Sequence, residues 1–126
     1  MSLTNTFETT VLTWLLTASS ATRPTSWYLG LFTAPPGEAG GGTEVSGNAY
    51  VRKAVTFTVT GNTASNDGAV EWPVATGSWG TITDVAIFDA VTGGNMIGYA
   101  TLTTAKTIST GDVFRIPVGD LDVTLD

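Results

Sequence analysis

The sequence predicts an all-β fold, an antiparallel β-sandwich preceded by one N-terminal α-helix. From residue 27 onward, apolar residues repeat with a period of two, which is typical of strands with one buried face. Turn signals rich in Gly, Asn and Asp separate these short segments. No helical pattern alternates with the strands, so a parallel βαβ arrangement is not expected. Jelly-roll connections between the strands are one candidate topology.

The chain of 126 residues is predicted to be a single domain over 1–126, with the helix at 5–18 and the β-sandwich at 27–126. A chain of this length removes roughly two thirds of its unfolded surface from water when it folds. It can therefore build an apolar core without covalent staples. The first residues lack a basic segment and include Glu8 and several threonines, so neither a secretion signal nor a membrane span is expected.

One helix is predicted, over residues 5–18. Asn5 is the expected N-cap, with Glu8 three residues later in the position of a capping box. Apolar residues at spacings of three, four and seven share one face of this helix: Phe7, Val11, Trp14, Leu15 and Ala18. Threonines fill the other side, and because Thr is a poor helix former, the helix needs a surface to pack on. That surface is either the domain's own core or a neighbouring subunit.

Eight later segments are predicted strands: 27–33, 50–60, 69–74, 83–89, 96–103, a weak one at 106–109, 113–117 and 121–125. The alternation is clearest where Val55, Phe57 and Val59 alternate with threonines, which predicts a half-buried strand with a Thr-lined outer face. Residues 92–95 are expected to form a hairpin loop, because Gly and Asn accept the positive φ that tight turns require. Residues 66–68 are a further turn signal.

The sequence contains no Cys and no His. These absences exclude disulfides, thiolate or His-ligated metal sites, and Ser-His-Asp or Cys-His catalysis. Two pairs of aspartates, Asp84 with Asp89 and Asp120 with Asp122, match no calcium-loop spacing. Solvated aspartates at strand ends are the favoured interpretation, with a weak metal site as the alternative. We therefore predict a non-enzymatic protein with no catalytic residues, no cofactor and no metal.

Eleven acidic and five basic residues give a net charge of −6. This charge repels phosphate groups, so neither nucleic acid nor an anionic membrane is expected as a partner. Arg52, Lys53 and Arg115 are expected to form ordinary surface ion pairs where they lie near acidic residues such as Glu44. Only 13% of the residues are charged, which indicates that some apolar or Thr-rich surface contacts another protein.

A long loop is predicted at residues 34–48, between two strands. It contains Pro35 and Pro36, five glycines, and the acidic residues Glu38 and Glu44. Loops of this length in compact domains are usually functional or mobile. We expect the loop to be a contact element, with plain disorder as the alternative.

Trp79 lies in the loop sequence Thr-Gly-Ser-Trp-Gly, which offers few apolar neighbours. A tryptophan that its own chain cannot bury can anchor another chain, and we predict that role for Trp79. The other aromatic residues are expected in the core or in a subunit interface, because each ring covers about 150 to 250 Å². A sugar-binding surface lined by aromatic rings is the alternative.

Four motifs, which lie after Ser26, occur together in this chain. They are LGLFTxxPGEAGxGTEVSG, YVRKAVTF, IFDAxTGGN and the closing GDLDVTLD. In combination, they resemble a family of small virion proteins of tailed bacteriophages, often labelled tail-fibre-like or decoration proteins. The resemblance covers nearly everything after Ser26. It implies a structural protein of the virion. Because neither a secretion signal nor a membrane span is expected, we expect synthesis and assembly in the host cytoplasm.

The first functional prediction is a capsid decoration or cement protein, a homo-oligomer (dimer or trimer) that bridges subunits of the major capsid protein. The alternative is a tail-fibre, collar or tail-tip component that binds a host glycan or another tail protein. In both cases the mechanism is burial of surface against other virion proteins. The predicted interface residues come from the helix, the long loop and the Trp79 loop: Phe7, Val11, Trp14, Pro35, Pro36, Glu38, Glu44 and Trp79.

Overall fold

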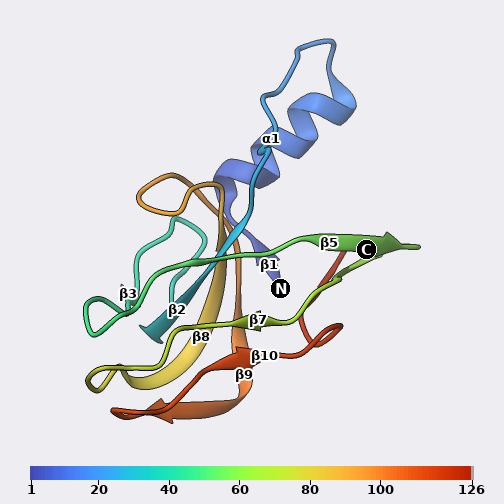
Figure 1. The fold of residues 1–126 in the computed structure, drawn as a ribbon. Coiled ribbons are helices and arrows are strands. Elements are labelled where there is room, and N and C mark those ends of the chain that lie inside the picture. Colours follow the sequence, from blue (N-terminus) through green and yellow to red (C-terminus); the bar gives the residue numbers. More distant parts are fainter. Residues whose placement is uncertain (126) are drawn as a thin grey trace.

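The computed structural model describes residues 1–125, which form one α-helix followed by a body of short strands (Figure 1). The helix is α1 (Asn5–Leu16). The strands are β1 (Ser2–Leu3), β2 (Tyr28–Ala34), β3 (Thr43–Glu44), β4 (Lys53–Ala54), β5 (Phe57–Thr60), β6 (Thr63–Asn66), β7 (Val70–Glu71), β8 (Gly80–Phe88), β9 (Met96–Ile108), β10 (Arg115–Ile116) and β11 (Asp122–Thr124). The predicted single domain over 1–126 stays a prediction, and its last residue lies outside the described part of the chain.

The strands form one main sheet and two small sheets, and every pairing is antiparallel. The main sheet has the order β1-β9-β8-β2-β3, with β4 also pairing with β2. The small sheets are β10-β7 and β11-β6-β5. The predicted all-β antiparallel class with one N-terminal helix is therefore confirmed. This strand order does not show a jelly roll.

The main core lies between the main sheet and the small sheets. Alternate residues of β2 point to opposite faces, so Leu29 and Leu31 enter this core while Phe32 enters a smaller cluster behind the sheet. From the small sheets and their flanking loops come Trp72 and Phe114, whose rings meet edge to face at 5.3 Å. The alternating pattern of the sequence thus yields a body whose two layers enclose apolar side chains.

The start of α1 differs from the prediction. Thr4, not Asn5, is the N-cap residue, and no side chain caps the helix. The Thr4 hydroxyl instead donates to the Met96 carbonyl at 2.7 Å, while the Thr4 amide donates to the Ile97 carbonyl at 2.9 Å. Pairing with β9 therefore fixes where the helix begins, and the predicted capping box is wrong. The helix ends at Leu16, two residues before the predicted end, because Thr17 is extended.

Several strand boundaries also differ from the predictions. The predicted strand at 50–60 is two strands, because β4 pairs with β2 of the main sheet whereas β5 pairs with β6. Val59 is 70% exposed, so the predicted buried face ends at Phe57. The segments 96–103 and 106–109 lie almost wholly in one strand, β9, which is joined to β8 by the predicted hairpin loop. Three short strands were not predicted: β1, β3 and β6.

Candidate interaction surfaces

The helix and the chain that follows it stand apart from the body of the protein. Figure 1 shows α1 projecting away from the strands and the next segment returning beside it toward β2. We call residues 5–26 the α1 lobe. Phe7 at its base is the one residue of α1 that is buried. The rest of the helix has little of its own chain to pack against.

Large apolar side chains gather in the second half of α1. Leu12, Trp14, Leu15 and Leu16 are 55%, 64%, 62% and 72% exposed, respectively. Because successive helical residues are rotated by about 100°, these four side chains span about 200° of the helix circumference. An apolar arc this wide on an exposed helix is typical of a helix that is buried by a partner.

The apolar arc has two adjacent parts, a ridge and a groove. We call Leu12, Leu15 and Leu16 the leucine ridge. Beside it, α1 and the returning segment enclose a mostly apolar hollow of about 430 Å³, which we call the lobe groove. The lobe groove is lined by Phe7, Thr10, Val11, Trp14, Ala21, Arg23 and Pro24. Three predicted interface residues, Phe7, Val11 and Trp14, therefore meet in one place.

The body carries a second apolar hollow, at the open end between the β11-β6-β5 sheet and the main sheet. It has a volume of about 350 Å³, and we call it the body groove. It is lined by Trp27, Phe57, Val59, Ala64, Ile87, Ile97 and Val123. Val59, Ala64 and Val123 lie side by side across the three strands of the small sheet.

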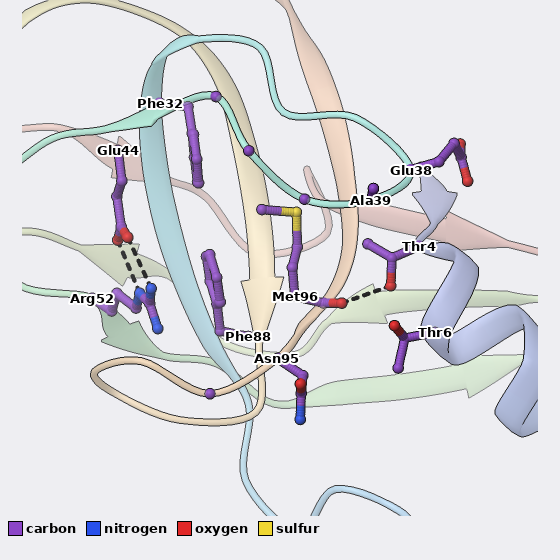
Figure 2. Close-up of a pocket in the computed structure, with 14 residues that line it drawn as sticks. Thr4, Thr6, Phe32, Glu38, Ala39, Glu44, Arg52, Phe88, Asn95 and Met96 are labelled. Atoms are coloured by element: carbon purple, nitrogen blue, oxygen red, sulfur yellow. Dashed lines mark hydrogen bonds and ion pairs between the residues drawn. The ribbon is translucent and has the colours of Figure 1, made fainter.

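Arg52 fastens the long loop to the hairpin that joins β8 and β9. Its guanidinium donates to both carboxylate oxygens of Glu44, from Nη2 at 2.8 Å and from Nε at 2.9 Å (Figure 2). Its Nη1 donates to the carbonyls of Ala90 and Gly93 at 3.0 and 2.8 Å. The guanidinium carbon also lies 3.4 Å from the centroid of the Phe88 ring. The prediction of an ordinary surface ion pair is wrong here, since Arg52 is largely enclosed.

Tyr50 completes this arrangement, which we call the Arg52 clamp. Its hydroxyl donates to Glu44 Oε2 at 2.7 Å and accepts the Leu31 amide at 2.9 Å. Burial, and then the hydrogen bond to the Glu44 carboxylate, raise the pKa of Tyr50 well above its usual value. Both carboxylate oxygens of Glu44 are thus hydrogen-bonded to Arg52 or Tyr50 within their own chain.

The remainder of the 34–48 loop is also held by its own chain. The Asn5 amide donates to the Glu38 carbonyl at 2.9 Å, and the Tyr99 hydroxyl donates to Glu38 Oε1 at 2.6 Å. Gly37 and Gly40 exchange two backbone hydrogen bonds across a tight turn. These contacts favour an ordered loop over the disordered alternative.

A hollow of about 380 Å³ lies between this loop, the start of α1 and the 89–95 hairpin loop (Figure 2). Phe32, Phe88 and Met96 contribute its apolar lining, and Glu38, Asn95 and Thr6 contribute polar groups. Within residues 1–125, no three His, Cys, Asp or Glu side chains gather closely enough to hold a metal ion. Across that same range, no helix has the length and hydropathy needed to span a membrane.

Asp84 in β8 and Asp89, the residue that follows β8, have structural partners. Asp84 is buried, so the prediction of a solvated aspartate is wrong there. Its carboxylate accepts the hydroxyls of Thr83 and Thr101 at 2.7 and 2.9 Å. Asp89 accepts the backbone amide of Asn95 at 2.7 Å and thereby closes the hairpin loop.

Trp79 is buried, contrary to the prediction of an exposed anchor. It is 5% exposed, and its Nε1 donates to the Asn48 carbonyl at 2.9 Å. Its ring meets the Tyr50 ring edge to face at 5.5 Å. Trp79 belongs to the main core, and its partners Asn48 and Tyr50 lie about thirty residues away, so the local loop sequence gave no sign of them.

The other predicted interface residues are divided between surface and interior. Pro35 and Glu38 are exposed, whereas Pro36 is buried and Glu44 is held in the Arg52 clamp. The sequence reasoning did not single out Leu12 and Leu16, although the run Leu12 to Leu16 contains four large apolar residues. That local density was the available signal.

The sequence matches a known protein family. The family described as "Podophage GP4 fiber I protein gp80" matches residues 2–124. The chain belongs to this family of phage fibre proteins and is a virion component. No curated protein matches it significantly. The family supports the tail-fibre alternative and does not support the capsid cement protein that was predicted first.

Proposed function

We propose that this protein is a non-enzymatic structural part of a podophage tail fibre, held in place by contacts with other virion proteins. The observation that carries this proposal is the fibre-family match over residues 2–124. The exposed apolar α1 lobe supports it, because a fibre component works by association.

The size of the apolar surface is consistent with an assembly role. The three ridge leucines and Trp14 each expose more than half of their surface. Contiguous exposed apolar side chains of this kind mark an interaction site. Burying such a surface against a partner contributes about 25 cal/mol per Å² before the costs of association. In a lone copy the surface stays exposed to water, so this stabilisation is not gained.

The aromatic residues favour a protein partner over a host glycan. A glycan-binding platform needs ring faces that are open to solvent. Trp72 and Trp79 are buried in the body, and Trp27 is partly buried in the body groove. Trp14, the most exposed tryptophan, lies beside the leucine ridge and lines the mostly apolar lobe groove.

The arrangement of the polar groups supports a structural role. The carboxylates of Glu44 and Asp84 are occupied by Arg52, Tyr50 and threonine hydroxyls. These groups position loops and strands. The long loop thus supports the body, and α1 is left as the principal contact element.

The proposal is tested by counting copies of this protein in purified virions, using quantitative mass spectrometry normalised to the major capsid protein. A tail-fibre component is expected at a small multiple of the tail symmetry, on the order of tens of copies per particle or fewer. A count on the order of hundreds, in a simple ratio to the shell subunit, would contradict the tail location.

A further inference from the structure

We infer that the α1 lobe is a self-association site, in which the leucine ridge of one copy packs into the lobe groove of a second copy. This inference rests on the proposed function and names the partner of α1. It makes the contact protein-to-protein and homotypic.

The ridge and the groove lie next to each other on one helix. The ridge stands out from α1, and the lobe groove is an apolar hollow of about 430 Å³, large compared with a leucine side chain. A second copy presents the same pair of surfaces. Each copy can therefore offer its ridge and accept another's, reciprocally in a dimer or around a ring.

The α1 lobe and the rest of the chain differ in net charge. The α1 lobe contains two charged residues, Glu8 and Arg23, which cancel. The whole excess of six negative charges therefore lies in the rest of the chain. Contact through the bodies would bring two acidic surfaces together, whereas contact between lobes would not.

Glu8 and Arg23 lie on opposite sides of the proposed contact. Glu8 lies one helical turn before Leu12, on the ridge side of α1, and Arg23 lines the lobe groove. Both are exposed, and within the described residues neither forms an ion pair in its own chain. A ridge that enters a partner's groove carries Glu8 toward the partner's Arg23.

The area of a stable contact also requires both surfaces of the lobe. A stable interface buries roughly 800 Å² on each partner. Three leucine side chains alone do not cover an area of that size. Using ridge and groove together adds the walls of the hollow, which brings the contact closer to that size. Packing between copies therefore needs both surfaces.

The test is analytical ultracentrifugation of the full chain over a concentration series. The ridge variant is Leu12→Glu with Leu16→Glu, and the groove variant is Ala21→Phe, which fills the hollow. Each is expected to weaken self-association at least tenfold. Mixing the two variants is expected to give a hetero-complex, because one supplies the ridge and the other the groove.

Two controls keep this test decisive. Thr10→Phe fills the same groove from the helix side and should weaken association as Ala21→Phe does, with thermal melting used to confirm that each variant folds. Val74→Glu with Val118→Glu places the same two charges at exposed valines of the body and should leave association within twofold of wild type. If this body variant weakens association as the ridge variant does, the lobe is not the specific site.

A charge exchange tests the pairing of Glu8 with Arg23. Glu8→Arg and Arg23→Glu should each weaken association severalfold, and the double variant should recover most of that loss. Failure of the double variant to recover would overturn the pairing. Disruption by Val59→Glu, as strong as that of the ridge variant, would overturn the inference by placing the ridge in a neighbour's body groove.

The outcome for this inference is separable from that for the proposed function. A wild-type chain that stays monomeric at all concentrations would overturn the self-association site. If that protein were nevertheless found in virions at a tail-like copy number, the fibre assignment would stand. A shell-like copy number would overturn the fibre assignment whatever the association state.

Discussion

The α1 lobe and the 34–48 loop differ in how many of their side chains find partners within their own chain. Sequence features pointed to both as contact elements. In the loop, the Glu44 carboxylate is paired with Arg52 and Tyr50, and Glu38 accepts hydrogen bonds at its backbone and its side chain. In the lobe, four large apolar side chains have no such cover. The lobe, whose apolar side chains lack partners within the chain, is therefore a better candidate contact site for another protein than the loop with its unusual composition.

This difference has a physical origin. Glycines and prolines determine the backbone conformation of a segment, and that conformation can bring the segment into contact with its own chain. Exposed apolar surface is unfavourable in water, and covering it with another surface lowers the free energy. Variants of the loop should therefore change stability, and variants of the lobe should change association.

The largest expected effect on stability comes from Arg52→Ala. It leaves the partly buried Glu44 carboxylate without its cation and frees two backbone carbonyls of the hairpin loop. We expect a loss of about 3 kcal/mol in the free energy of unfolding, measured by urea denaturation. The control is Arg115→Ala, since Arg115 is exposed and forms no ion pair among the described residues. Equal losses for the two variants would show that the clamp does not hold the loop.

A second prediction compares two neighbouring glycines of the loop. Both have positive φ, +73° at Gly42 and +84° at Gly41. A Cβ at Gly42 would lie 2.7 Å from the Ala34 carbonyl oxygen, whereas nothing lies within 4 Å of one at Gly41. Gly41→Ala should cost about 1 kcal/mol from backbone strain alone, and Gly42→Ala about 1 kcal/mol more. Thermal unfolding of both variants measures the difference, and equal costs would mean that the loop packs loosely there.

A third prediction concerns Tyr50 and alkaline pH. Because its pKa is raised in the folded protein, Tyr50 keeps its proton when the unfolded chain has lost it, above roughly pH 10. Its stabilising contribution is therefore complete below that pH and falls as pH rises further. Tyr50→Phe should cost about 1 kcal/mol at neutral pH and should flatten this alkaline decline. Unfolding curves at pH 8 and above about pH 10 measure both effects; an unchanged alkaline slope would contradict the role of burial.

The smallest expected effect on stability comes from Leu15→Glu with Leu16→Glu. Both side chains are exposed, and Glu and Leu have similar helix propensities, so the change should stay within about 0.5 kcal/mol. The same substitution should markedly reduce association. A loss of several kcal/mol in urea denaturation would instead mean that the lobe is packed within its own chain.

The sequence anticipated the features that local signals encode. The helix, the alternation in β2 and β8, and the Gly-Gly hairpin loop each depend on residues close together in the chain. The two-residue strand β1 exists because β9, far along the chain, offers its edge, which no local pattern records. The two-residue strand β3 pairs with β2 across the 34–43 segment, which carried no strand pattern of its own. The environment of Trp79 depends on a turn about thirty residues away. The Arg52 clamp likewise joins segments up to 41 residues apart.

The most direct test of the account is incorporation into virions of the Leu15→Glu, Leu16→Glu variant, with the Val74→Glu, Val118→Glu variant of the body as the matched control. Both are supplied to a phage lacking its own copy of the protein, and the copies per particle are counted by quantitative mass spectrometry. The account predicts at least a tenfold loss of the α1 variant and normal incorporation of the control. Normal incorporation of both would contradict the claim that the exposed half of α1 holds this fibre protein in the particle.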